Sequence, residues 1–209
     1  MRHKVPVKEK AVAFTFDDGP NAVYTPQMME IFSKAGGKAT FYMIGSKIEE
    51  NEETARAVHA QGHEIGNHTY AHPRLTEQTL EEAREELRRT DERIREVTGL
   101  PVRTFRPPYF ACDDRILRLA SEFGYVSIGA CNPDTRDWEQ PGVDYILERT
   151  RPTVGPGAIF LFHDGNGDRS QTVEAVRILV EELSAEGYRF VTVSELLAMA
   201  DCLRFLDSR

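Results

Sequence analysis

Hydrophobic positions along this chain follow two alternating patterns. Short apolar runs rich in β-branched and aromatic residues, such as 10–17 (KAVAFTFD), predict strands. Longer stretches with apolar residues three or four positions apart, such as 76–99, predict amphipathic helices. In chain order the predicted strands are 10–17, 39–44, 63–67, 104–106, 125–130, 158–163 and 190–192, and the predicted helices are 25–35, 53–61, 76–99, 113–123, 143–150, 172–186 and 193–200.

The alternation amounts to about seven strand–helix units, which indicates an α/β protein with a parallel sheet covered by helices. A closed sheet would be a barrel of fewer than eight units, since a full eight takes about 250 residues. An open, doubly wound sheet usually binds its ligand through a Gly-rich first turn. The turn after the first predicted strand is instead Asp17-Asp18-Gly19-Pro20. No Pro/Gly/Ser-rich linker interrupts the pattern, so we expect one domain.

Composition and charge exclude several classes of protein. The chain has 209 residues, 34 of them acidic and 26 basic, and its net charge of −8 argues against nucleic acid as a partner. No run approaches the roughly 18 apolar residues of a membrane span. Residues 1–10 lack the apolar stretch of a signal peptide, so the protein is intracellular or its export sequence has been removed. Cys112, Cys131 and Cys202 are too scattered for a disulfide framework or a cysteine zinc site.

Five polar clusters follow predicted strands. In α/β barrels the active site lies at the carboxyl ends of the strands, so these clusters are candidates for one shared site. They are TFDDGP (15–20), HTYAH (68–72), RPPY (106–109), DTRDW (134–138) and LFHD (161–164).

The first two clusters contain residue types that bind metals. Asp17 and Asp18 are adjacent carboxylates that repel each other unless a positive charge is near, and a metal ion would supply it. His68 and His72 have a spacing that zinc sites use, although Pro73 makes their segment a turn or loop. Two imidazoles and one carboxylate would leave a metal open positions for water and substrate. The alternatives are an ordinary Asp-Gly-Pro turn and two unrelated histidines.

The other three clusters offer groups for acid–base chemistry and substrate binding. Arg106 could hold a carboxylate through two hydrogen bonds. Asp137 could orient a histidine, and Trp138, the only Trp of the chain, could form one wall of a sugar-sized cleft. His163 ends the most apolar strand, where burial and a nearby Asp would tune its pKa for acid catalysis. The alternatives are a surface Arg, a charged loop with an anchoring Trp, and a core His bonded to backbone.

Together and in this order, the five clusters resemble the motifs of the polysaccharide deacetylases, the NodB-like carbohydrate esterases of family four. The similarity spans about 10–197, so 1–209 is expected to be one NodB homology catalytic domain. The resemblance implies a distorted (β/α) barrel with about seven parallel strands. It implies hydrolysis of the N-acetyl group of N-acetylglucosamine residues in chitooligosaccharides or peptidoglycan, with release of acetate. It also implies an extracellular or cell-surface location; we expect a monomer.

The resemblance also implies a role for each site residue. A divalent metal, zinc before cobalt or manganese, would be held by Asp18, His68 and His72. The remaining implied roles are catalytic base for Asp17, its charged partner for Arg106, catalytic acid for His163, tuning of that histidine for Asp137, oxyanion binding by the backbone N–H of Tyr109, and an acetyl pocket lined by Trp138 and Leu161.

Phe110 departs from the family pattern, and Asp18 distinguishes between two branches of the family. The usual Gly after RPPY is Phe110, which disfavours the positive φ that Gly allows. We therefore expect either altered loop geometry near Tyr109 or an added aromatic residue in the sugar cleft. Relatives that act on N-acetylmuramic acid lack the second Asp of TFDDGP, so the presence of Asp18 favours the metal-dependent branch that acts on N-acetylglucosamine.

Two other functions stay open. An O-deacetylase of acetylated xylan would use the same machinery, because ester and amide hydrolysis need the same groups. A glycan-binding protein without turnover would be expected to lose Asp17 or His163, and both are present.

Overall fold

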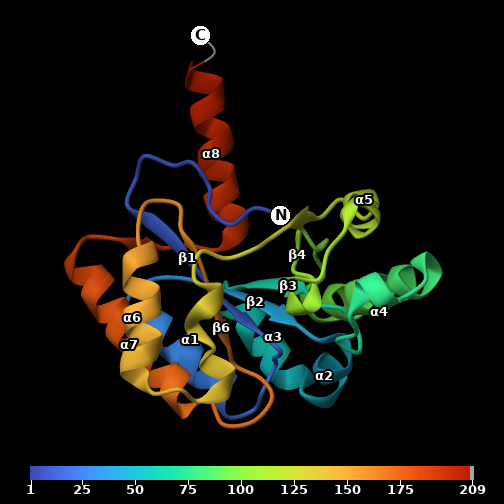
Figure 1. Ribbon diagram of the computed structural model, residues 1–209, viewed down its shortest axis with the longest axis horizontal. Helices are drawn as coiled ribbons and strands as arrows, with labels where there is room; N and C mark the ends of the chain where they lie inside the picture. Colours follow the sequence, from blue (N-terminus) through green and yellow to red (C-terminus); the bar gives the residue numbers. More distant parts are fainter. Residues whose placement is uncertain (208–209) are drawn as a thin grey trace.

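The computed structural model describes residues 1–207, with side chains described as far as Cys202. The strands form one curled sheet with helices packed around it (Figure 1). Their order is β5-β4-β3-β2-β1-β6, β7 pairs with the start of β1, and every strand pair is parallel. The strands are β1 (Ala11–Asp17), β2 (Thr40–Met43), β3 (Glu64–Asn67), β4 (Thr104–Phe105), β5 (Val126–Ser127), β6 (Ile159–His163) and β7 (Arg189–Phe190).

This sheet confirms the predicted distorted barrel. Its strands neighbour one another in chain order from β1 to β5, and β6 pairs with the free side of β1. An open, doubly wound sheet would leave β5 and β6 at two distant edges. Here the sheet curls until the chain after β5 reaches β6, where the Cys131 N–H donates to the carbonyl oxygen of Ile159 at 2.8 Å. All seven predicted strands are present, although β5 is shorter than the predicted 125–130 and β7 lies slightly earlier than 190–192. The open, doubly wound alternative is therefore wrong.

The helices follow the prediction with three differences. α2 was not predicted, because six residues are too few to show a helical repeat of apolar positions. α4 begins at Leu80 rather than 76, since Thr79 and Glu82 form a capping box there. α8 continues beyond 200, where the sequence offers no Gly or Pro to end it. The helices are α1 (Tyr24–Lys34), α2 (Gly45–Glu50), α3 (Glu52–Ala60), α4 (Leu80–Thr98), α5 (Asp114–Glu122), α6 (Val143–Thr150), α7 (Ser170–Ala185) and α8 (Val193–Asp207).

The two faces of β1 explain how the barrel directs the polar residues at the end of this strand. Val12, Phe14 and Phe16 belong to the large apolar cluster between the sheet and its covering helices. Residues at odd positions point the other way, since side chains alternate along a strand. Ala11 and Ala13 accordingly belong to a second cluster, which α8 joins. Asp17, at the end of the strand, therefore faces the interior of the barrel at its mouth.

The barrel seam between β5 and β6 is bridged by the start of the chain. Arg2 pairs with Ile128, just after β5, and Lys4 pairs with Ala158, just before β6. Val5 lies fully buried in the interior cluster with the first turns of α8, which then extends away from the barrel (Figure 1). The N-terminal end of the barrel is thus filled by apolar side chains, and the opposite end is left for polar ones. No helix in the described part of the chain is both long and apolar enough to cross a membrane.

Candidate active site

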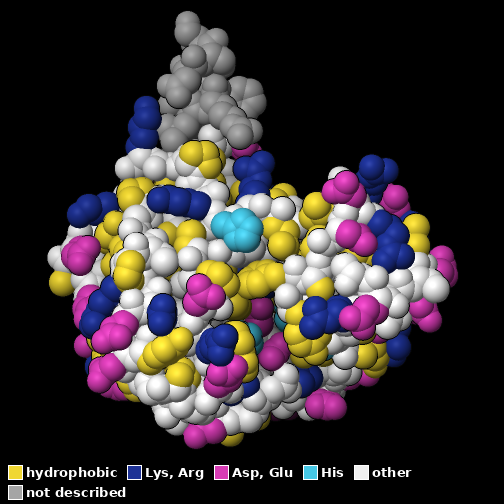
Figure 2. Space-filling view, in the orientation of Figure 1, with side chains coloured by type: hydrophobic (Ala, Val, Ile, Leu, Met, Phe, Trp, Pro, Cys, Tyr) yellow, Lys and Arg dark blue, Asp and Glu magenta, His cyan; other side chains and the backbone are white. Residues whose placement is uncertain are grey.

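A pocket of about 500 Å³ opens at the carboxyl end of the barrel strands. Acidic and histidine side chains lie recessed in a hollow near the centre of the face seen in Figure 2. Arg106 and Asp137 lie fully buried behind the pocket wall. The predicted site residues that line the pocket are Asp17, Asp18, His68, His72, Tyr109, Phe110, Trp138, Leu161 and His163.

Asp18, His68 and His72 form a cluster whose possible ligand atoms all lie within 4.8 Å of one another. Asp18 Oδ1 lies 3.5 Å from His68 Nε2 and 3.2 Å from His72 Nε2. The segment that carries the histidines is a loop rather than a helix, as Pro73 predicts, with left-handed backbone at Thr69. Burial alone would raise the pKa of Asp18, but hydrogen bonding to the two imidazoles lowers it below its ordinary range, so the carboxylate is ionised.

The second nitrogen of each imidazole tests whether these residues fit a metal. His68 Nδ1 donates to the carbonyl oxygen of Arg106 at 2.7 Å, so Nε2, which faces Asp18, is the nitrogen that would give up its proton to bind a metal. His72 Nδ1 lies 3.2 Å from the hydroxyl of Tyr109, which can accept a hydrogen bond from it. Such partners fix the orientation of metal-binding histidines. Two imidazoles and a carboxylate, held in this way, fit zinc or a similar divalent ion.

The Asp17 carboxylate contacts a buried arginine through one of its oxygens. Its Oδ1 accepts a hydrogen bond from Arg106 Nη1 at 2.7 Å. The guanidinium is fully buried and also donates to Thr15 Oγ1 and to the carbonyl oxygen of Gly129. Arg106 therefore makes a single hydrogen bond to Asp17. The expected pair of hydrogen bonds to one carboxylate is wrong, because the second amino group of Arg106 donates to Gly129 instead. Asp17 Oδ2 lies 3.7 Å from His68 Nε2, next to the Asp18–His68–His72 cluster.

His163 is the register partner of Asp17 on the neighbouring strand β6. Its Nδ1 donates to Asp137 Oδ1 at 2.8 Å, and its backbone N–H donates to Asp137 Oδ2 at 2.8 Å. Thr172 Oγ1 donates to the same carboxylate, which fixes its orientation. Burial alone would lower the pKa of His163, but the Asp137 carboxylate outweighs it and raises this pKa to about 9. The imidazole is therefore protonated at neutral pH, with Nε2 on the side away from Asp137.

Aromatic and apolar side chains form the pocket walls. The Trp138 ring lies edge-on to His163, with ring centroids 5.1 Å apart, and Leu161 is buried at the pocket base. Tyr109 and Phe110 both adopt left-handed backbone, with φ of 58° and 51°. Phe110 therefore adopts the positive φ for which Gly is suited, and its side chain adds an aromatic residue to the pocket lining. Such a conformation costs about 1–2 kcal/mol.

Three residues near this site were given no role from the sequence. Asn166 and Arg169 line the pocket from the loop after β6. Asp164, the last residue of the LFHD cluster, is fully buried, and burial raises its pKa to about 7. The stretch 163–169 resembles a loop of the deacetylases, but that resemblance assigned no role to these three residues. Asn and Asp are too common in loops for their presence alone to assign a role.

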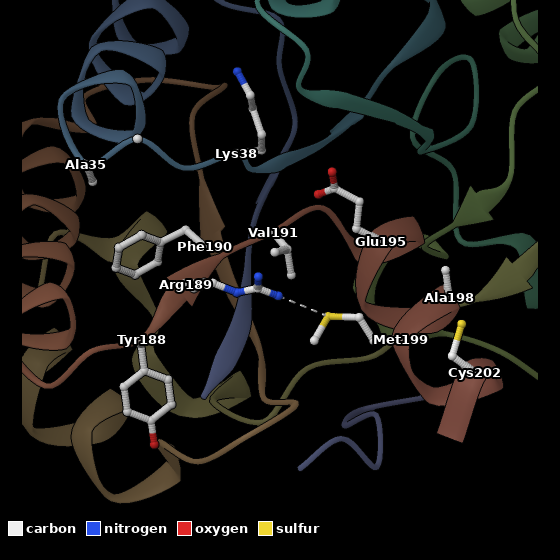
Figure 3. Close-up of a pocket in the computed structure, with 11 residues that line it drawn as sticks. Ala35, Lys38, Tyr188, Arg189, Phe190, Val191, Glu195, Ala198, Met199 and Cys202 are labelled. Atoms are coloured by element: carbon white, nitrogen blue, oxygen red, sulfur yellow. Dashed lines mark hydrogen bonds between the residues drawn. The ribbon is translucent and has the colours of Figure 1, made fainter. Parts of the chain in front are cut away.

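A second hollow, of about 610 Å³, lies at the other end of the barrel (Figure 3). It runs between the start of β7 and α8, where Arg189 reaches toward Met199. Lys38, just before β2, and Glu195, in the first turn of α8, place it at the amino ends of the strands. Although larger, this hollow holds none of the five polar clusters, and the smaller pocket is the candidate active site.

Comparison with known proteins decides the family. The family model described as polysaccharide deacetylase matches residues 4–128. This chain belongs to the polysaccharide deacetylase family. A peptidoglycan-N-acetylglucosamine deacetylase of Bacillus cereus is 40% identical over 195 residues, which are 93% of this chain and 91% of the relative. A chitooligosaccharide deacetylase of Azorhizobium caulinodans is 32% identical over 197 residues, 88% of this chain and 93% of the relative.

Solved structures of polysaccharide deacetylases share the same fold. A peptidoglycan N-acetylglucosamine deacetylase in complex with a benzamide compound superposes with a TM-score of 0.89 at 29% identity, covering 94% of this chain and 92% of its own. A family pseudoenzyme from Bacillus anthracis has a TM-score of 0.85 at 32% identity, covering 93% and 68%. The CE4 domain of a multidomain xylanase, from a Trinervitermes trinervoides hindgut metagenome, has a TM-score of 0.83 at 32% identity, covering 91% of each chain.

Proposed function

We propose that this deacetylase removes the N-acetyl group from N-acetylglucosamine residues of peptidoglycan or chitooligosaccharides, with the help of one divalent metal, and releases acetate. One observation carries the proposal. The Asp18–His68–His72 cluster shares a pocket with the carboxylate of Asp17 and the protonated imidazole of His163. Amide hydrolysis needs a proton acceptor for water and a proton donor for the leaving nitrogen.

Asp18, His68 and His72 would hold the metal. When bound, it would polarise the acetyl carbonyl and acidify a water molecule. Asp17 accepts the proton of the attacking water, and Arg106 holds that carboxylate in place through the buried hydrogen bond of 2.7 Å. Asp17 thus acts as base while its neighbour Asp18 faces the imidazoles, a division of roles that different surroundings allow.

His163 donates its Nε2 proton to the departing nitrogen. Asp137 keeps the imidazole protonated and fixes which nitrogen faces the pocket. The backbone N–H of Tyr109 contributes to oxyanion binding, while Trp138 and Leu161 enclose the acetyl methyl and shield His163 from water.

The choice of substrate rests on the relatives' names. The two relatives compared above are named for peptidoglycan N-acetylglucosamine and for chitooligosaccharides, which favours an N-acetylated glycan over acetylated xylan. The xylanase-derived structural neighbour keeps O-deacetylation as the second candidate. Glycan binding without turnover is disfavoured, because Asp17 and His163 both face the pocket. Since these polymers lie outside the cytoplasm, we also propose that the protein acts outside the cell or at its surface.

Side-by-side assays of acetate release test the proposal. Chitooligosaccharides, peptidoglycan and acetylxylan would each be incubated with the zinc-loaded and the chelated protein. Release from either of the first two, dependent on zinc, is the expected result. Release from acetylxylan alone would keep the mechanism and overturn the substrate. Release from none of the three would favour a binding protein.

Replacing one imidazole should empty the metal site. We expect His68→Ala to lower bound zinc from about one ion per chain to a small fraction of that, since it removes one of three protein ligands. Elemental analysis after dialysis against dilute zinc measures this. His59→Ala, on α3, serves as the matched control and should keep full occupancy. Full occupancy in His68→Ala would rule out the ligand assignment.

Removing the charge beside His163 should move the alkaline limit of activity. In the parent protein the Asp137 carboxylate raises the pKa of His163 to about 9, so the proton donor persists into mildly alkaline solution. In Asp137→Asn this support is lost, the pKa of His163 falls, and the protonated form disappears at lower pH. The measurement is kcat against pH. An alkaline limb at the parent's position would show that His163 is not the acid.

Phe110 should contribute to sugar binding rather than to chemistry. Its ring lines the pocket without touching Asp17 or His163 in any described contact, and Gly suits the left-handed backbone there. Loss of an aromatic contact of about 1 kcal/mol should raise KM roughly fivefold. We therefore expect Phe110→Gly to raise KM for an oligosaccharide with kcat almost unchanged. Steady-state kinetics decide, and a loss confined to kcat would contradict this role.

A further inference from the structure

The loop after β6 makes direct contact with Asp18. Asn166 Nδ2 donates to Asp18 Oδ2 at 3.1 Å, while Oδ1 of the same carboxylate faces His68 and His72. The two carboxylate oxygens are therefore divided between the imidazoles and the amide. Asn166 contacts the oxygen that is turned away from the imidazoles, so its hydrogen bond controls the rotation of the carboxylate.

The orientation of this amide follows from a second contact. The ammonium group of Lys47, on α2, donates a hydrogen bond to Asn166 Oδ1. An ammonium group can only donate hydrogen bonds, so it holds the amide oxygen on the α2 side. The amide nitrogen must then point toward Asp18, which needs a donor. The reverse orientation would place donor against donor on one side and acceptor against acceptor on the other.

The backbone around Asn166 is held rigidly. Arg169, which is only 4% exposed, donates through its guanidinium to the carbonyl oxygens of Asn166 and Gly165. The loop passes so close to the first motif that a Cβ on Gly165 would lie 1.9 Å from the carbonyl oxygen of Asp18. Asn166 itself has left-handed backbone with φ of 60°, which Asn tolerates better than most residues. The amide is thus placed before any ligand arrives.

We propose that Asn166 and Lys47 are positioning residues that orient the Asp18 carboxylate and thereby set the affinity of the metal site. Neither belongs to the five polar clusters. The inference rests on the metal site proposed above. Hydrogen-bond partners of metal ligands typically change metal affinity about 10–100-fold when they are removed.

A zinc titration of the metal-free protein, in competition with a chromogenic chelator, tests this without any substrate. Asn166→Gly removes the amide and suits the left-handed backbone, so the loop keeps its course. Its zinc Kd should be weaker than the parent's by about 10–100-fold. Lys47→Met keeps the apolar stem and frees the amide to rotate, so it should weaken zinc binding less. In the Asn166→Gly background, Lys47→Met should cause no further weakening, because the lysine acts through the amide.

A control in the same loop separates positioning from loop stability. Tyr24→Phe removes the hydrogen bond of 2.9 Å between the Tyr24 hydroxyl and Asp168 Oδ1, two residues beyond Asn166. It should leave the zinc Kd unchanged, and thermal melting of each metal-free variant confirms that it is folded. A parental Kd in Asn166→Gly, or equal weakening in Tyr24→Phe, would overturn the inference. Parental zinc binding by His68→Ala would instead overturn the metal site itself.

Discussion

Asp17→Asn should abolish most turnover while leaving the metal bound. The amide cannot accept the proton of the attacking water, and loss of a general base typically costs about 10²–10⁴-fold in rate. Asn keeps an oxygen acceptor for Arg106, so the buried contact of 2.7 Å can survive. The measurements are kcat for acetate release and zinc per chain. Unchanged turnover would refute the role of Asp17 as base.

The neighbouring carboxylate provides the matched control for Asp17. Asp18→Asn should lose bound zinc as well as activity, since Asp18 is the only carboxylate in the proposed ligand set. The free energy of unfolding of Asp17→Asn should also be measured by urea denaturation, because this variant leaves the buried Arg106 charge without its counter-charge. Breaking a buried pair can cost about 3–5 kcal/mol. If Asp17→Asn loses zinc to the same extent as Asp18→Asn, the two carboxylates do not divide their roles as proposed.

His163→Ala should slow amide hydrolysis far more than hydrolysis of an activated ester. A departing amine needs a proton, whereas a nitrophenolate leaves without one, so the acid matters only for the first. We expect a loss of about 10²–10⁴-fold on a chitooligosaccharide and only a small loss on 4-nitrophenyl acetate. The readout is the ratio of the two kcat/KM values, since this ratio is insensitive to a fraction of unfolded protein.

His59→Ala changes a histidine on α3 that does not line the pocket. It should leave both rates at the parental level. Equal slowing of amide and ester by His163→Ala would argue that the imidazole has a structural role only.

The alternation of apolar and polar positions was sufficient to predict the sheet. Buried strands such as β1 and β6 stand out because their apolar runs are flanked by turn residues and followed by periodic helices. Short elements were harder to predict from the sequence. Helix α2, of six residues, carries no repeat long enough to recognise, and its lysine, Lys47, reaches the site only because the chain folds back after β2.

Residue type and order identified the candidate chemistry, but the contacts depended on the fold. Asp17 and His163 are distant in sequence and meet only through the register of β1 and β6. The reach of Arg106 across the barrel to Thr15 and Gly129 follows from its burial, which no local pattern encodes. Asn166 could be given no role from the sequence for the same reason, because the role proposed for it depends on a left-handed backbone and on a lysine from another element.

The most direct test of the proposed function is acetate release as a function of bound zinc. The chelated protein would be titrated with zinc, and acetate from N-acetylglucosamine oligomers and zinc per chain would be measured on the same samples. Metal-dependent deacetylation predicts release that is negligible without zinc and rises in proportion to bound metal until about one ion per chain is reached. Undiminished release from the chelated protein would contradict it.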